Sequence, residues 1–300
     1  LVQTVKHVPA FVHGGPFANI AHGTNSIVAT RMALKLRDYA IVEAGFASDL
    51  GAEKFFDIVC RLSGLSPSAV VLVTTVRSLK HHGGVKKEEL SKENLDALSS
   101  GISNLEAHLD ILSNFGLPVV VALNKFNTDT KEELDMVMEA AKKRNARIAL
   151  SEVWEKGGEG GIDLAKEVLE AIGEGKTYRT LYDLDMSLKE KIKTIATRIY
   201  GADDVEYVPQ ALAMLEDLEQ RGFGSLPVCM AKTQLSLSDD PKKLGRPKDY
   251  RVTVREVRLS AGAGFVVAIC GSIMTMPGLP KKPAAESIDI DEKGNINGLF

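Results

Sequence analysis

Short apolar runs rich in β-branched residues limit what this 300-residue chain can fold into more than any other feature. They span residues 69–75, 117–123 and 146–150, and each has the length of a strand that is buried on both faces. A helical repeat of apolar positions over residues 131–143 separates the second run from the third. Because parallel strands need such crossover segments, the pattern predicts an α/β fold with a mostly parallel sheet.

The N-terminal part extends the same alternation. Residues 39–43 are expected to form a further strand, and residues 49–65 are expected to form a helix that leads into the 69–75 strand. In open parallel sheets, ligands bind beyond the carboxyl ends of the strands. The polar loops that follow these strands are therefore the places to search for a site.

The C-terminal part mixes helices with alternating strands. Ser187 and Glu190 form a capping-box pattern that begins a helix ending at Gly201. A second helix is expected over residues 209–220, and alternation over residues 250–258 predicts a strand with one exposed face. We expect three domains, at residues 1–112, 113–203 and 204–300.

Composition narrows the class of protein. The net charge of -3 gives no reason to expect a nucleic acid partner. No apolar stretch approaches the roughly 20 residues that span a bilayer, and no signal segment opens the chain, so we expect a cytoplasmic protein without a membrane partner. The three cysteines are widely spaced in apolar surroundings, which predicts buried free thiols at Cys60, Cys229 and Cys270.

Five idiosyncratic motifs run through the chain. They are His13-Gly-Gly-Pro-Phe-Ala-Asn-Ile-Ala-His-Gly23, Glu43-Ala-Gly-Phe-Ala-Ser-Asp-Leu-Gly-Ala-Glu-Lys-Phe55, Asn124-Lys-Phe-Asn-Thr-Asp-Thr130, Ser151-Glu-Val-Trp-Glu-Lys-Gly-Gly-Glu-Gly-Gly161 and Met274-Thr-Met-Pro-Gly-Leu-Pro-Lys281. In these motifs the chain resembles formate-tetrahydrofolate ligase over nearly its whole length. The resemblance implies that ATP with Mg²⁺, formate and tetrahydrofolate are substrates. It also makes a monovalent cation a candidate cofactor and a homo-oligomer a candidate assembly.

The phosphate-binding loop that this family uses, G-x-x-x-x-G-K-S/T, does not occur in the sequence. The nearest imitation, residues 173–177, lacks the first glycine and follows a helical pattern, so we expect a helix cap with an exposed lysine there. The resemblance thus implies an incomplete sheet of the P-loop NTPase-like type, followed by two smaller α/β or α+β domains. The phosphate-binding segment is either lost or carried by a separate P-loop-bearing chain, and we expect no ATP turnover without such a companion.

Aromatic residues in the loops are the candidate folate ligands. Trp154 and Phe126 each follow a predicted strand, where they either flank a flat ligand or cap the local core. The resemblance implies that both rings stack on the folate ring system and that Phe46 contributes to the same cleft. Asn127 stands where relatives often have proline.

Polar groups in the first two motifs are candidates for the chemistry. The resemblance implies that Phe17, Ala18 and Asn19 face the formyl phosphate pocket, with Asn19 a donor to a developing oxyanion; a structural turn is the alternative. Asp49 and Glu43 are the carboxylates best placed to handle a proton or metal-bound nucleotide, and Asp49 lies in the better-matching segment. The neighbouring pair, residues 47–48, is Ala-Ser where the family usually has Gly-Ala.

Lys80 and His82 are candidate anion ligands, although exposure to solvent is the commoner fate of such a lysine. His81 stands where the family usually has methionine. Adjacent histidines on an extended loop diverge and no third ligand is spaced to help, so we expect no resident metal site there.

Two segments resemble motifs of other function classes. Residues 124–127 resemble the base-reading motif of GTPases, but the fourth position lacks a carboxylate. Residues 287–297 resemble a calcium loop, but they lack its central glycine and terminal glutamate spacing. A non-catalytic folate-binding or assembly subunit stays open as the alternative to an enzyme.

Overall fold

The structure is a computed structural model that describes residues 1–4, 6–14, 17–273, 282–283, 286–292 and 296–298. The α-helices are α1 (Ile27–Leu36), α2 (Arg61–Ser63), α3 (Val76–His82), α4 (Leu95–Ser113), α5 (Lys131–Lys143), α6 (Val153–Lys156), α7 (Ile162–Gly173), α8 (Leu188–Ile195) and α9 (Pro209–Gln220). Wider π-type turns span Ser48–Ala52, Phe55–Cys60 and Ala196–Tyr200, and 3₁₀ turns span Lys87–Glu89 and Gly157–Gly161. The strands are β1 (Val2–Gln3), β2 (Pro9–Ala10), β3 (Val70–Thr74), β4 (Val119–Asn124), β5 (Arg147–Ser151), β6 (Asp204–Tyr207), β7 (Val228–Ala231), β8 (Arg251–Ser260), β9 (Phe265–Cys270), β10 (Asp289–Ile290) and β11 (Ile296–Asn297).

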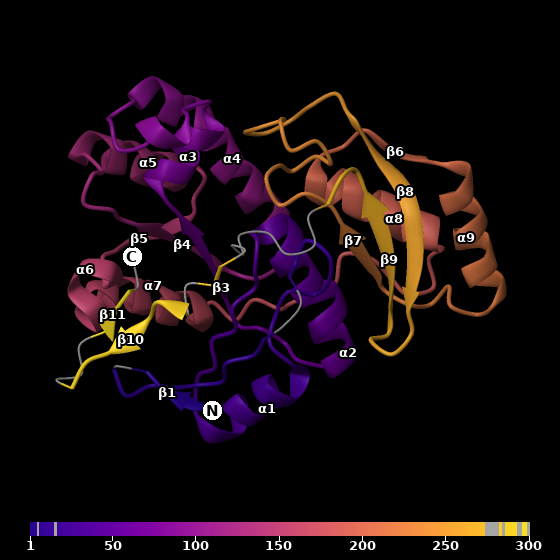
Figure 1. The fold of residues 1–300 in the computed structure, drawn as a ribbon, viewed down its shortest axis with the longest axis horizontal. Helices are drawn as coiled ribbons and strands as arrows, with labels where there is room; N and C mark the ends of the chain where they lie inside the picture. The colour runs from indigo at the N-terminus through magenta and orange to yellow at the C-terminus, as the bar shows by residue number, and fades with distance from the viewer. Residues whose placement is uncertain (5, 15–16, 274–281, 284–285, 293–295, 299–300) are drawn as a thin grey trace.

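The strands β3, β4 and β5 form a parallel sheet in that order, which confirms the α/β prediction and its three principal strands (Figure 1). The helices α4 and α5 carry the chain from one strand to the next, and α7 packs against β4 and β5. In Figure 1, α5 and α7 lie on opposite sides of this sheet. The central strand β4 is almost wholly buried, as its continuous apolar sequence predicts.

Local sequence explains where the crossover helix α5 begins. The side chain of Thr130 accepts a hydrogen bond from the backbone N–H of Glu133, and the carboxylate of Glu133 accepts one from the backbone N–H of Thr130. This capping box satisfies N–H groups that would otherwise lack partners at the first turn. It fixes the distance from the end of β4 to the helix, and so shapes the loop that carries Phe126.

The expected strand at residues 39–43 is wrong. These residues lie outside any strand, and Ile41 is 98% exposed. The N–H of Gly45 donates to the carbonyl of Gly23 at 3.1 Å, which ties the end of this segment to the first glycine-rich motif. The apolar run therefore takes no part in the β3–β4–β5 sheet, and Val73 on β3 stays 64% exposed.

The helix expected over residues 49–65 is confirmed, and it is wider than an ordinary α-helix. Helical turns run from Ser48 to Ser63, and Gly64 ends them in the left-handed conformation at φ 70°. π-type turns are rare and occur frequently at functional sites. The segment is largely buried, so its polar residues must find partners inside the protein.

A second, mixed sheet has the order β6-β8-β9-β7. The strand β8 buries Val252 and Val254, and after an irregularity in its pairing with β9 it buries Val257. The expected alternation over 250–258 is therefore present but shifted by one residue. The helix predicted from the Ser187 capping box also forms, as α8 and a π-type turn that ends at Gly201.

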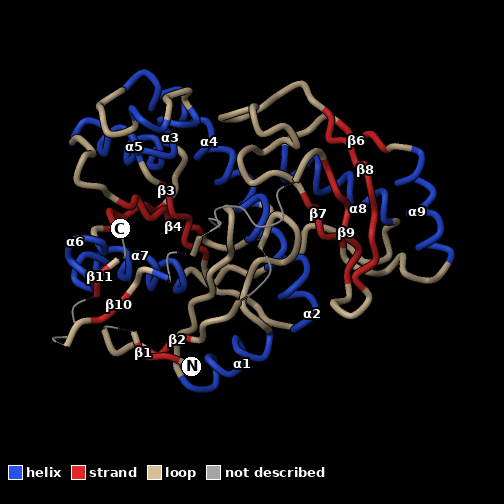
Figure 2. Tube along the Cα trace, in the orientation of Figure 1, coloured by secondary structure: helices blue, strands red, loops and turns tan. Residues whose placement is uncertain are grey.

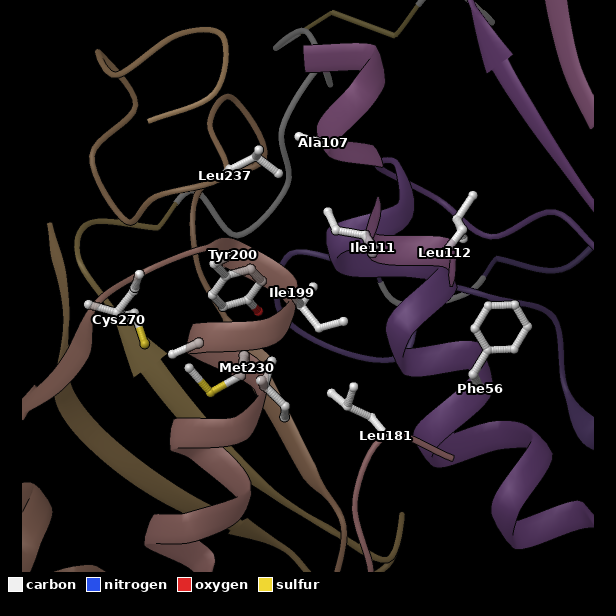
Figure 3. Packing of buried hydrophobic residues seen from close by; sticks show 14 of the residues in the cluster. Phe56, Ala107, Ile111, Leu112, Leu181, Ile199, Tyr200, Met230, Leu237 and Cys270 are labelled. Atoms are coloured by element: carbon white, nitrogen blue, oxygen red, sulfur yellow. The ribbon is translucent and has the colours of Figure 1, made fainter. Parts of the chain in front are cut away.

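The two sheets share one apolar core. Figure 2 shows the strands of these two sheets apart from each other, each group with helices against it. Phe56, Ile111 and Leu112 face Tyr200 and Met230 across this core (Figure 3). The pairing of β3 with β4 crosses the expected boundary at residues 112 and 113, and the division into three domains stays a prediction.

Two smaller expectations are confirmed. All three cysteines are buried free thiols. The helix α7 ends at Gly173, and the nearby Lys176 pairs with Glu174 on the surface at 2.8 Å. Within the described ranges, no helix is both long and apolar enough to cross a bilayer.

Candidate functional site

The carboxyl ends of β4 and β5 bring Phe126 and Trp154 into neighbouring loops. Asn124 pairs with Ser151 at the last position of both strands, and the N–H of Lys125 donates to the carbonyl of Ser151 at 3.0 Å. Trp154 is 69% exposed and Phe126 is half-buried. Neither ring is sealed in the core, so both are accessible to a ligand at this edge of the sheet.

A compact turn fixes Phe126. Its N–H donates to Oδ2 of Asp129 at 2.8 Å, and the N–H of Asp129 donates back to the carbonyl of Phe126 at 3.1 Å. Asn127 lies exposed at the tip of this turn. The turn is thus closed by Asp129 without the proline that relatives often carry at position 127.

A second turn fixes Trp154. The N–H of Glu152 donates to the carbonyl of Gly160 at 3.0 Å, so the glycine cluster folds back on the start of the loop. A side chain at Gly160 would collide with the backbone of Glu152 at 2.4 Å. The carboxylate of Glu152 also pairs with Lys125 at 2.7 Å and with Lys156 at 2.5 Å. The glycines therefore let a charged bridge join the Phe126 and Trp154 loops.

The first two motifs form a separate aromatic pair. Phe17 and Phe46 stack with 5.8 Å between ring centroids and 16° between ring planes. A side chain at Gly23 would collide with Ala18, so only glycine at this position allows the first motif to fold back on itself this closely. Among the described residues, no ring contact joins this pair to Phe126 or Trp154.

The predicted catalytic Asn19 is fully buried, as is Ala18 beside it. The ammonium of Lys54, in the helical part of the second motif, donates to the carbonyl of Ala18. Burial lowers the pKa of Lys54 from its ordinary value. The first motif is therefore anchored on a buried lysine that sequence reasoning did not single out.

Asp49 is committed to an internal ion pair. Its Oδ2 accepts a hydrogen bond from Nζ of Lys232 at 2.8 Å, and both side chains are almost inaccessible to solvent. Lys232 also donates to the carbonyls of Thr233 at 3.1 Å and Ser236 at 2.5 Å. All three protons of the ammonium thus have acceptors, and the pair fixes the second motif to the second sheet.

Strain is concentrated just before Asp49. Ala47 has φ 64° and ψ -178°, a backbone region that glycine alone occupies without cost. The preceding Phe46 also has a positive φ, of 57°. Glycine at position 47, as the resemblance leads one to expect, would relieve this strain.

Replacing Ala47 with glycine is therefore expected to stabilise the protein by about 1 kcal/mol, after the extra freedom of glycine in the unfolded chain is deducted. Thermal unfolding would show this as a rise in Tm of about 2–4 °C. Ala165→Gly, at an exposed position inside α7, is the matched control and should lower stability by roughly the same amount. If Ala47→Gly and Ala165→Gly lowered the stability equally, the backbone at position 47 would not be strained.

Lys80 is neither exposed nor available to a ligand. It is fully buried, and its Nζ donates to Oε1 of Glu133 at 2.7 Å and to the carbonyl of Lys92 at 2.8 Å. Burial would raise the pKa of Glu133, but hydrogen bonds from Lys80 and from two backbone N–H groups lower it overall. This buried pair joins α3 to α5.

His82 also has a structural partner. Its Nδ1 accepts a hydrogen bond from the N–H of Gly245 at 3.1 Å, and burial lowers its pKa to about 4, with a smaller effect from His108. The neighbouring His81 places Nδ1 3.1 Å from the carbonyl of Val85. Across the part of the chain that the structure describes, no group of three His, Cys, Asp or Glu side chains could hold a metal ion.

Glu53 carries a buried carboxyl group on the helical segment Ser48–Ser63. Among the residues that the structure describes, neither oxygen of Glu53 has a hydrogen-bond partner, although the side chain is fully buried. Burial, followed by repulsion from Asp57, raises the pKa of Glu53 well above its ordinary value. The environment of Glu53 in the folded protein therefore favours its neutral form.

This buried acid makes stability depend on pH with a definite sign. Above pH 4.5 the unfolded chain releases the proton of Glu53 while the folded chain keeps it, so its contribution to stability falls as pH rises. Glu53→Gln should not lose stability in this way. The difference in unfolding free energy between Glu53→Gln and the unaltered chain should therefore grow, in favour of Glu53→Gln, by up to about 1.4 kcal/mol per pH unit. Urea unfolding from pH 4.5 to 8 measures it, with the exposed Glu216→Gln as control. An advantage that is independent of pH would mean that Glu53 is ionised in the folded state.

Sequence reasoning missed the partners that hold the site together. The pairing of Lys232 with Asp49 could not be predicted, because the two residues lie 183 positions apart in the sequence. The fifth motif, residues 274–281, lies outside the described residues. So does part of the 287–297 segment, whose described residues include the β10–β11 hairpin.

A sequence model of the family described as "Formate--tetrahydrofolate ligase" matches residues 1–300 of the chain. This match covers both sheets and the two loops that carry Phe126 and Trp154. The chain therefore belongs to the formate-tetrahydrofolate ligase family of ATP-dependent ligases.

Proposed function

We propose that this chain carries the folate side of a formate-tetrahydrofolate ligase. In the reaction, formate attacks the γ-phosphate of ATP to give formyl phosphate and ADP. The N10 amine of tetrahydrofolate then attacks the formyl carbon, releases phosphate and gives 10-formyltetrahydrofolate. The observation that carries the proposal is the placement of Phe126 and Trp154 at the carboxyl ends of adjacent parallel strands, where ligands of α/β sheets bind.

Phe126 and Trp154 are the proposed stacking residues for the pteridine ring, because accessible aromatic faces are well suited to hold flat heterocycles. The stacked Phe17 and Phe46 are proposed to border the same ligand from the first two motifs. The charged bridge of Lys125, Glu152 and Lys156 would keep the two stacking loops at a fixed separation.

The first two motifs are proposed to shape the formyl phosphate pocket. We keep Asn19 as the proposed oxyanion donor, although its burial requires the loop to open toward the substrate. We assign Asp49 a positioning role, because its carboxylate is held by Lys232 and is nearly inaccessible. Lys80 and His82 are left out of the proposed ligand set, since their polar atoms are engaged within the protein.

The 300-residue sequence contains no G-x-x-x-x-G-K-S/T motif. ATP use is therefore proposed to require a P-loop-bearing segment in addition to this sequence. Mg²⁺ would enter bound to the phosphates of ATP. A cytoplasmic location fits these substrates and is part of the proposal.

The test mixes the purified chain with ATP, formate and tetrahydrofolate and follows 10-formyltetrahydrofolate. We expect no synthesis by the chain alone, and synthesis when a P-loop-bearing chain of the family is added. Robust synthesis by the chain alone would contradict the need for that segment. Tight tetrahydrofolate binding with no synthesis in either mixture would instead favour the non-catalytic folate-binding subunit.

A further inference from the structure

A charged side chain lies on the ring of Phe126. The guanidinium carbon of Arg77 is 4.4 Å from the centroid of this ring, which is the geometry of a cation–π contact. Arg77 belongs to the first turn of α3, directly after β3, whereas Phe126 follows β4. One side chain therefore spans the ends of two neighbouring strands.

A second contact fixes the position of this guanidinium. Nη2 of Arg77 donates to Oγ1 of Thr128 at 3.2 Å, and Thr128 belongs to the same turn as Phe126. Nε of Arg77 is buried without a hydrogen-bond partner in the described structure. The ring of Phe126 and the hydroxyl of Thr128 are thus the two groups that hold the guanidinium.

The strand order shows which side of Phe126 this contact occupies. Because β4 lies between β3 and β5, the loop of Phe126 lies between the loops of Arg77 and Trp154. Arg77 comes from the loop that follows β3, so the strand order leads us to expect that it meets the ring from the β3 side. The side of the ring that remains is the one toward β5 and Trp154.

We propose that Arg77 is a positioning residue that covers one face of the Phe126 ring and directs the other face toward the flat ring of the substrate. The inference rests on the proposed function, since it takes Phe126 as a stacking residue. Its physical basis is preorganisation, because a ring that is already held in place loses less freedom when the ligand binds.

Arg77→Met should weaken tetrahydrofolate binding about tenfold, as measured by calorimetric titration of the full chain under anaerobic conditions. The affinity of Arg77→Lys for tetrahydrofolate should lie between those of Arg77→Met and the unaltered chain, because lysine keeps the charge but cannot stack as a planar group. The matched control is Arg221→Met, since the guanidinium carbon of Arg221 lies 5.4 Å from the centroid of the Phe223 ring. Arg221 directly follows α9, which lies at the opposite side of Figure 1 from β4 and β5. Binding by this control should equal that of the unaltered chain.

A double-mutant cycle separates positioning from direct ligand contact. If Arg77 acts through Phe126, then Arg77→Met should change affinity less than twofold when Phe126 is already alanine. A tenfold effect that persists in the Phe126→Ala background would show that Arg77 contacts the ligand itself, and would overturn the inference.

A spectroscopic readout tests the ring without any ligand. With 4-fluorophenylalanine at position 126, Arg77→Met should shift and broaden the fluorine resonance of the free protein, and an unchanged resonance would overturn the inference alone. Failure of the unaltered chain to bind tetrahydrofolate would overturn the proposed function, and the inference with it. The two failures are therefore distinguishable.

Discussion

Lys232→Met is expected to destabilise the folded protein by about 3–5 kcal/mol, because it leaves the carboxylate of Asp49 buried without its cationic partner. The desolvation of a charge is costly, and here the lost ammonium had satisfied three acceptors at once. Since folded proteins of this kind are stable by only about 5–15 kcal/mol, the loss would be visible in a urea unfolding curve.

The control for this prediction is Lys189→Met, which removes an exposed lysine paired with Glu216 at 3.4 Å. Such surface pairs contribute about 0–1 kcal/mol. A loss below 1 kcal/mol for Lys232→Met would show that the pair does not fix the second motif.

Trp154→Ala is expected to weaken tetrahydrofolate binding by about 10- to 100-fold, since stacking of a flat base on an aromatic side chain contributes about 1–3 kcal/mol. Because Trp154 is 69% exposed, the same substitution should leave the unfolding free energy nearly unchanged. Phe126→Leu should weaken binding by a similar factor while keeping an apolar side chain at a half-buried position.

Phe223→Leu is the matched control for Phe126→Leu, because both rings lie beneath an arginine and only Phe126 lies at the carboxyl edge of the parallel sheet. The control should bind tetrahydrofolate as the unaltered chain does. Unchanged affinity for both Trp154→Ala and Phe126→Leu would remove these rings from the folate site.

The strands of the parallel sheet could be predicted because their information is local. Each apolar run is continuous, and the capping box at Thr130 and Glu133 marks the crossover helix. The run at residues 39–43 carries the same local pattern, yet it is held outside the sheet by the bond from Gly45 to Gly23. Strand pairing depends on such distant contacts, which an apolar run does not encode.

The aromatic positions of the candidate site could be predicted, and the groups that hold them could not. Phe126 and Trp154 stand directly after recognisable strands, so their loops follow from the topology. Arg77 reaches Phe126 from 49 positions away, and Lys232 reaches Asp49 from 183 positions away. The burial of Lys80 could likewise not be predicted, because only the fold shows that Lys80 and Glu133 lie within hydrogen-bond distance of each other.

The most direct test of the account is a crystal structure of this chain with tetrahydrofolate bound. The account predicts the pteridine ring between the side chains of Phe126 and Trp154, with Arg77 still covering the opposite face of Phe126. A pteridine bound elsewhere, or the two rings turned away from each other around an empty cleft, would contradict it.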